Sequence, residues 1–83
     1  MAEVVPPEWL DVPVSVEQLD GDYGVQTSGV HKDWERLKSE MRPGDQLMRF
    51  VSSYQSWEKH AGRMGIALVR DGKVIDAFVT MVN

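Results

Sequence analysis

The sequence predicts an α+β fold in which one main helix packs on a three- to four-stranded antiparallel sheet. Two observations lead to this prediction. Apolar residues recur at helical spacing within 27–42, and strand-like runs with an Asp-Gly turn fill 45–83, which we expect to form a β-meander. A chain of 83 residues is expected to form one domain, 1–83. Its composition, 42% hydrophobic and 27% charged, is typical of a globular protein.

The first part of the chain is expected to be an extended arm, 1–13. It holds three of the four prolines, and proline fixes φ and lacks an amide donor. Trp9 and Leu10 are costly to expose to water, so we expect them to anchor the arm on the rest of the domain. The next segment, 14–26, is predicted to be a short strand and a loop, because it contains the turn-forming run "DGDYG".

The predicted helix, 27–42, is the clearest element. Thr27 or Ser28 is expected to cap its start, and Arg-Pro-Gly at 42–44 is expected to end it. Its apolar stripe, which should face the core, consists of Val30, Trp34, Leu37 and Met41.

Three strands are predicted after the helix, at about 46–52, at about 64–70 and from 73 to near residue 82. Asp71-Gly72 between the last two is of the type that favours a tight type I′ hairpin. An uninterrupted register from this turn places Leu68 opposite Ile75 and Gly65 opposite Phe78.

This register divides the side chains between two faces of the sheet. The core face is predicted to carry Ile66, Leu68, Ile75, Ala77, Val79 and Met81. The opposite face is predicted to carry Val69, Val74 and Phe78, next to Asp76 and Thr80. Three large apolar side chains in water would cost several kcal/mol. We therefore expect either the arm or a second copy of the chain to cover them, and we treat Val69, Val74 and Phe78 as candidate binding residues.

The connection between the first two strands, 52–63, is long for a hairpin, and such connections are often functional or contain a turn of helix. The run "SWEKHAG" predicts such a turn, with Ser56 as its N-cap and Gly62 ending it at positive φ. The connection also supplies candidate binding residues, which are Tyr54, Trp57, His60 and Arg63.

The residue types argue against catalysis, metal binding and cofactor binding. Cysteine is absent, so a nucleophile would have to be a serine of the 52–63 connection with His60 as its base, and no nucleophile elbow is present. The two histidines, His31 and His60, fall on separate elements, which argues against zinc. No glycine-rich phosphate-binding motif occurs. We therefore assign no catalytic residues, no metal ligands and no cofactor.

The net charge of −4 is unevenly distributed. Residues 1–30 contain six acids and no lysine or arginine, whereas 31–83 contain nine basic residues and seven acids. This weak and dispersed excess of positive charge argues against nucleic-acid binding. The sequence contains neither a secretory signal pattern nor an apolar run of membrane-spanning length, so we expect a cytoplasmic location and no membrane association.

From Gly44 onward, "GDQLMRFVSSYQSWEKHAGRMGIALVRDGKVIDAFVTMVN" resembles small uncharacterised bacterial proteins. They share a "GD-L" strand, an "SW" loop, a "GR-G-ALVR-G-V" hairpin and an ending near "VT-MN". The resemblance covers about the C-terminal half. It implies a bacterial or phage origin, and it implies no activity, cofactor or functional residue.

These observations favour a non-enzymatic protein-binding or accessory protein whose partner is another protein or a second copy in a homodimer. One alternative is a small ligand-binding or catalytic domain that uses the 52–63 connection, which would need a pocket holding Trp57, His60 and Arg63. Another alternative is an acidic inhibitor or mimic, which would need the N-terminal acids to gather on one exposed surface.

Overall fold

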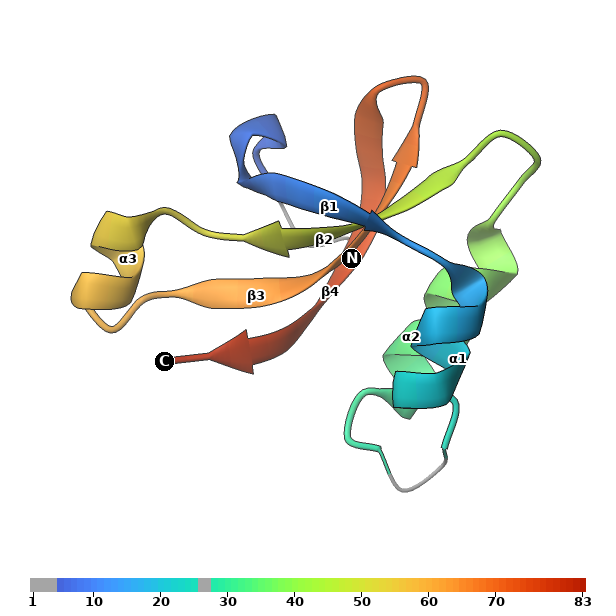
Figure 1. The fold of residues 1–83 in the computed structure, drawn as a ribbon, viewed down its shortest axis with the longest axis horizontal. Helices are drawn as coiled ribbons and strands as arrows, with labels where there is room; N and C mark the ends of the chain where they lie inside the picture. Colours follow the sequence, from blue (N-terminus) through green and yellow to red (C-terminus); the bar gives the residue numbers. More distant parts are fainter. Residues whose placement is uncertain (1–4, 26–27) are drawn as a thin grey trace.

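A computed structural model describes residues 5–25 and 28–83 and shows an α+β fold, as the sequence predicts (Figure 1). Its sheet has four antiparallel strands in the order β1-β2-β3-β4. The expectation of one main helix describes the helices only in part, because three α-helices are present in the described residues. Along the chain the elements are η1 Pro7–Trp9, β1 Leu10–Val14, α1 Val16–Tyr23, α2 His31–Glu40, β2 Gln46–Val51, α3 Tyr54–Glu58, β3 Arg63–Arg70 and β4 Lys73–Val82.

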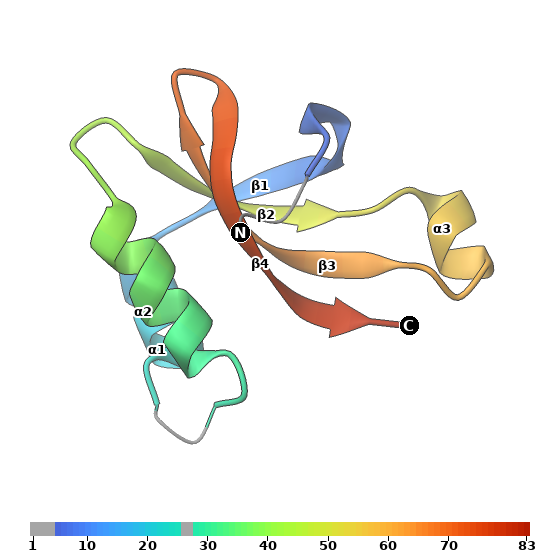
Figure 2. The ribbon, with the colours of Figure 1, turned by 180° about the vertical axis from the view of Figure 1, so that it is seen from behind.

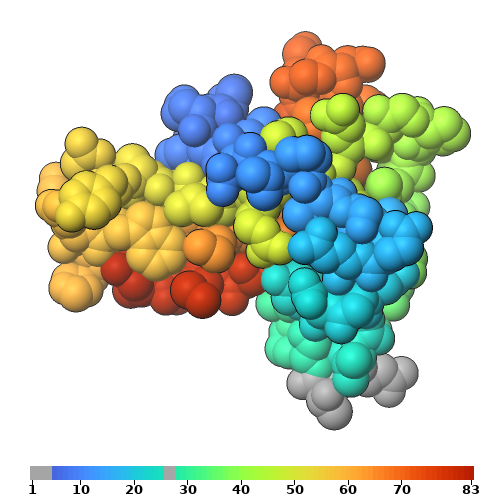
Figure 3. Space-filling model, viewed as in Figure 1, coloured from blue at the N-terminus to red at the C-terminus, as the bar shows by residue number. Residues whose placement is uncertain are grey.

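The helices lie at two different ends of the twisted sheet. α1 and α2 contact each other and lie at one end, whereas α3 lies at the other end, between β2 and β3 (Figures 1 and 2). The space-filling view shows the helix pair and the α3 end as two lobes that meet at an angle (Figure 3). In the described parts of the chain, no helix has the length and apolar character needed to cross a membrane.

The main core lies between the helix pair and the sheet. The predicted stripe of α2 is present, since Trp34 and Leu37 are fully buried in it. Asp20 of α1 joins the two helices, because its Oδ1 accepts hydrogen bonds from Trp34 Nε1 at 2.9 Å and from Lys38 Nζ at 2.8 Å. The buried residues of this cluster, which we call the helix-side core, are Leu19, Trp34, Leu37, Leu47, Ile66, Leu68 and Phe78.

Helix α1 corrects the prediction of a strand and loop over 14–26. Ser15 caps the helix by accepting a hydrogen bond from the Gln18 N–H, and Leu19 is fully buried. A glycine within a helix costs only about 1 kcal/mol, so Gly21 does not prevent helix formation when the buried Leu19 stabilises it.

The start of α2 also differs from the prediction. Its N-cap position is Val30, which makes no side-chain cap. The hydroxyl of Ser28 instead accepts a 3.4 Å hydrogen bond from the Val30 N–H just before the helix. The alternative cap, Thr27, lies outside the described residues.

The β3–β4 hairpin has the predicted turn but not the predicted register. Asp71 and Gly72 both have positive φ, 52° and 77°, as a type I′ turn requires. The register then shifts at a β-bulge, so that Leu68 pairs with Asp76 and not with Ile75. The predicted faces are therefore wrong from Asp76 to Val79, and a second register shift, between Met64 and Gly65, then pairs Met81 with Met64.

The bulge exchanges the surroundings of several β4 side chains. Ile75, expected in the core, is 36% exposed, and Asp76, expected in water, is 5% exposed. Phe78 turns into the helix-side core, where the edge of one ring of the Phe78–Tyr23 pair meets the face of the other at a centroid distance of 5.9 Å. Ala77 and Val79 turn to the opposite face of the sheet.

The described part of the N-terminal arm, from Val5, packs on this opposite face and continues into β1, the fourth strand of the sheet; residues 1–4 of the predicted arm lie outside the described residues. Trp9 stacks on Phe50 with ring centroids 6.4 Å apart, as expected for an anchor. Phe50 also contacts the bare backbone of Gly65, a place that the predicted register gave to Phe78. The buried residues of this second cluster are Val5, Phe50, Ala67, Val69 and Ala77, and the half-buried residues around them are Trp9, Leu10, Met48, Val74 and Val79.

Candidate functional site

The connection between β2 and β3 contains the expected helical turn, α3, but with different ends. Its N-cap is Ser53, whose side chain accepts a hydrogen bond from the Ser56 N–H, and not Ser56 itself. The residue with positive φ after the turn is His60, at 59°, and not Gly62. Gly62 is needed for another reason, since a Cβ at this position would overlap the Trp57 indole ring.

Serine hydroxyls fix the start of this connection. Ser52 is 5% exposed, and its Oγ accepts a 2.8 Å hydrogen bond from the Arg63 N–H and lies 2.7 Å from Ser56 Oγ. Ser56 Oγ in turn donates to the Ser53 carbonyl at 2.7 Å. The hydroxyls of Ser52 and Ser56 therefore form hydrogen bonds within the connection. In a catalytic serine the hydroxyl would instead be hydrogen-bonded to a neighbouring base.

Asn83 fixes the other side of the connection. Its Nδ2 donates to the Trp57 carbonyl at 2.7 Å, and its Oδ1 accepts from the Gly62 N–H at 2.9 Å. Sequence reasoning missed this residue, because nothing in the sequence indicates that an asparagine after β4 meets a loop more than twenty positions earlier. The α3 turn is therefore held by hydrogen bonds at both of its ends.

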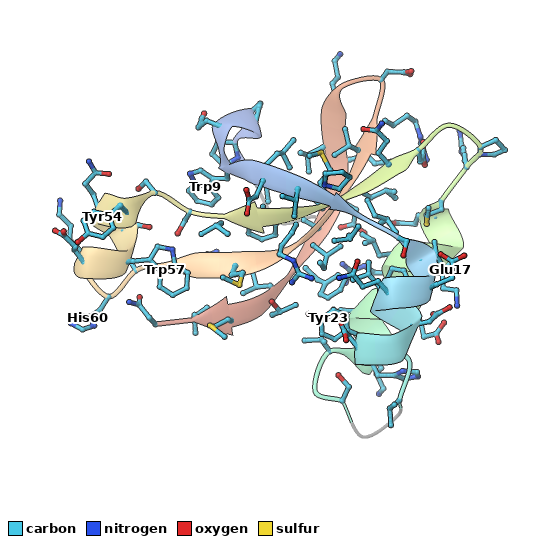
Figure 4. The ribbon with its side chains drawn as sticks, viewed as in Figure 1. Trp9, Glu17, Tyr23, Tyr54, Trp57 and His60 are labelled. Carbon is cyan, nitrogen blue, oxygen red and sulfur yellow. The ribbon has the colours of Figure 1, made fainter. Side chains whose placement is uncertain are left out.

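Several large side chains at this end of the molecule are exposed, and Met81 and Val82, which follow each other in β4, point to opposite faces of the sheet. Tyr54 is 75% exposed, and at the end of β4 Met81 is 54% and Val82 66% exposed. Figure 4 shows Tyr54 and His60 at the tip and Trp57 lying back towards β3. We call the following set the α3-end surface: Tyr54, Trp57, His60, Arg63, Met81 and Val82. Tyr54, Trp57, His60 and Arg63 are the candidate binding residues that the sequence suggests for this connection, and their role stays a prediction; Met81 and Val82 are added from the structure.

The other three predicted binding residues do not lie on this surface. Val69 and Phe78 are 6% and 3% exposed, and they belong to different clusters on opposite faces of the sheet. Val74 is half-buried beside the arm-covered cluster. The arm, one of the two expected covers, packs with Val69 and Val74. The bulge turns Phe78 into the helix-side core, so it does not belong to this face.

A network of charged side chains surrounds Asp76 where α2 meets β4. Arg36 Nε donates to Asp76 Oδ2 at 3.1 Å, and the Ala77 N–H donates to Asp76 Oδ1 at 2.8 Å. Burial acts to raise the pKa of Asp76, but hydrogen bonds from Glu40, Ala77 and Arg36 hold it below its ordinary value. The hydrogen bond with Asp76, assisted by burial, raises the pKa of Glu40. Two neighbouring carboxyl groups resist ionising together, so the pKa of Glu40 is raised while that of Asp76 is lowered.

A second ion pair, Asp45 with Arg70, borders a cavity. Arg70 donates to both carboxylate oxygens of Asp45, at 2.8 and 2.7 Å, and these bonds lower the pKa of Asp45 to about 2. The cavity, about 480 Å³ in volume, is lined by Ser39, Glu40, Met41, Arg42, Arg70 and Ile75. Another cavity, of about 620 Å³, is lined by Ser28, Gly29, His31, Lys32 and Glu35.

Neither of these cavities contains Trp57, His60 or Arg63, the residues that a ligand-binding 52–63 connection would bring together. His31 lies beside the larger cavity, with its Nδ1 3.1 Å from the Tyr23 carbonyl. Over 5–25 and 28–83, no three histidine, cysteine or acidic side chains are grouped so that they could hold a metal ion.

Comparison with known proteins gives no family assignment: no protein-family model, no curated protein and no solved structure matches the chain. The candidate site is therefore defined by its geometry alone.

Proposed function

We propose that the chain is a non-enzymatic protein-binding domain that contacts its partner through the α3-end surface. The observation that carries this proposal is the exposure of Tyr54, Met81 and Val82 at one end of the sheet, on backbone fixed by Ser52 and Asn83. Exposed apolar groups that gather in one place commonly mark contact surfaces.

The composition of the surface suits protein recognition. Tyrosine, tryptophan and arginine are the residues most enriched among those that dominate binding energy, and this surface contains one of each. Methionine adapts its shape to a partner because it is unbranched and flexible. The hydrogen-bonded α3 turn has little conformational freedom left to lose on binding, which favours affinity.

The alternatives receive less support from the geometry. A catalytic or ligand-binding connection would have free serine hydroxyls and a cavity at Trp57, whereas the hydroxyls of Ser52 and Ser56 bond within the connection. An acidic mimic would present its N-terminal acids together. Asp20 is instead bound to Lys38, and β1 separates Glu8 from Glu17.

The test is capture of proteins from a lysate of the native host on immobilised chain. We expect a protein that binds the wild-type chain to be retained at least about tenfold less by Tyr54→Ser and Met81→Lys, a loss of about 1.4 kcal/mol or more. Val12→Lys and Val25→Lys are matched controls, since Val12 and Val25 are 47% and 55% exposed elsewhere in the fold.

Equal retention by all four variants would contradict the proposed surface. The expected cytoplasmic location and bacterial origin remain part of this proposal. They predict that the partner is found in the cytosolic fraction of a bacterial host.

A further inference from the structure

The sequence contains two Asp-Gly pairs, Asp20-Gly21 and Asp71-Gly72, and the fold places them in very different surroundings. This dipeptide is chemically reactive, because glycine has no side chain to hinder its own amide nitrogen from attacking the carboxyl group of the preceding aspartate. The attack needs an amide nitrogen and a carboxyl group that are not held by hydrogen bonds, and it needs room for the backbone to rotate. These requirements distinguish the two pairs.

Asp71-Gly72 meets all of these requirements. The pair forms the exposed tip of the β3–β4 hairpin, at the far end of β3 from α3 (Figure 1). The Gly72 N–H and the Asp71 carboxylate have no hydrogen-bond partner among the residues that the structure describes. Arg70 attracts this carboxylate, but its guanidinium donates its hydrogen bonds to Asp45 and to the Glu40 carbonyl. A Cβ placed on Gly72 would meet no atom within 4 Å, so the backbone at this tip can rotate without a clash.

Asp20-Gly21 fails two of the requirements. The pair lies within α1, where the Gly21 N–H bonds to the carbonyl four residues earlier. The Asp20 carboxylate accepts the hydrogen bonds of Trp34 and Lys38. A Cβ placed on Gly21 would also meet no atom within 4 Å, so it is hydrogen bonding and not local space that sets the two pairs apart.

We propose that Asp71 is a site of spontaneous isoaspartate formation in the folded chain, and that the fold protects Asp20 from the same reaction. The Gly72 nitrogen bonds to Asp71 Cγ and gives up its proton, while one carboxyl oxygen leaves as water, and a five-membered succinimide ring closes. A water molecule then opens the ring. Cleavage of the N–Cγ bond restores aspartate, whereas cleavage between the nitrogen and the main-chain carbonyl carbon gives isoaspartate. One water is lost and one is gained, so nothing is oxidised or reduced.

Isoaspartate changes the hairpin because it inserts one methylene group into the backbone. A two-residue loop sets the register of its two strands, and Arg70 pairs with Lys73 directly beside this loop. The lengthened loop does not fit the type I′ geometry, so we expect the Arg70–Lys73 end of the ladder to open. The former main-chain carboxyl group becomes a side group on the exposed tip, where a carboxyl methyltransferase specific for isoaspartate can reach it.

The test is prolonged incubation of the whole wild-type chain at neutral pH, followed by proteolysis and mass spectrometry with electron-transfer fragmentation, which distinguishes isoaspartate from aspartate. We expect at least about tenfold more isoaspartate at Asp71 than at Asp20. The reason is that α1 must open before Asp20 can react, and an opening cost of about 1.4 kcal/mol corresponds to a tenfold lower rate. In concentrated urea, where neither pair is held by the fold, the two sites should react at similar rates.

A substitution and a second measurement complete the test. Asp71→Glu keeps the charge but would need a six-membered ring, so it should remove the modification at this position and leave Asp20 unchanged, with far-UV circular dichroism confirming the fold. The Lys73 amide should exchange its hydrogen faster in the modified chain. Equal amounts at the two sites in the folded chain overturn the inference. It is also overturned if Asp71 stays unmodified in the folded chain over a period in which it reacts in urea.

Discussion

Replacing Ile75 or Asp76 with alanine tests the β-bulge in β4 directly. In the regular register that the sequence favours, Ile75 lies in the core, and its truncation would cost about 2–5 kcal/mol. Asp76 would be at the surface, where substitutions usually change stability by no more than about 0.5 kcal/mol. The observed fold predicts the opposite order.

The expected magnitudes follow from the contacts. Ile75 is 36% exposed, so Ile75→Ala should lower the free energy of unfolding by less than about 1 kcal/mol. Asp76→Ala removes the acceptor of the buried Ala77 N–H, and an unsatisfied buried donor costs about 1–3 kcal/mol. Arg36 also loses its bonds, but its side chain is 44% exposed and water replaces them at low cost. We expect a total loss of about 2–3 kcal/mol.

Urea unfolding followed by far-UV circular dichroism measures both values. A loss of 2 kcal/mol is large for a domain of this size, whose total stability is on the order of 4–12 kcal/mol. Asp76→Asn is a useful third variant, because it retains an oxygen acceptor and should lose less than Asp76→Ala. If Ile75→Ala proves the more destabilising of the two alanine variants, the bulge and the faces derived from it are incorrect.

Three further changes test other parts of the fold. Leu19→Ala should cost about 2–5 kcal/mol, because Leu19 is fully buried, and a loss below 1 kcal/mol in urea unfolding would argue against the packing of α1. Gly62→Ala should cost about 1–3 kcal/mol through overlap with Trp57; the melting temperature measures this, and an unchanged value would contradict the contact. The pKa of Asp45 is lowered from 3.8 to about 2 by Arg70, so the stability from this pair is complete above about pH 4. It is lost as the pH falls towards 2. Asp45→Asn should flatten this part of the stability–pH curve, and an equally steep curve would rule out the pair as its source.

Local patterns predicted the elements whose signals are contained within a few residues. The stripe with Trp34 and Leu37 and the stop after Met41 describe α2 well, because helical spacing and a following Arg-Pro-Gly are both local. The Asp71-Gly72 turn was predicted for the same reason. α1 was missed because glycine and aspartate in its sequence suggested a loop, while its cap at Ser15 and buried Leu19 were overlooked.

The contacts between residues far apart in the chain could not be predicted from the sequence. At the bulge Asp76 contacts Arg36, from a helix forty positions earlier, whereas an apolar pattern alone favours Ile75 in the core. Four residues of the α3-end surface are candidates because of the length and composition of their connection, and their binding role stays a prediction. Met81 and Val82 join them only because β4 ends beside that connection, held there by Asn83.

The placement of the three tryptophans has a practical consequence for spectroscopy. Trp9 stacks in the arm-covered cluster, Trp34 donates its indole N–H to Asp20 between α1 and α2, and Trp57 lies against Gly62 in the α3 turn. Each of the three regions therefore contains its own indole resonance in an NMR spectrum. Loss of these signals at different denaturant concentrations would show which region melts first, without any label being introduced.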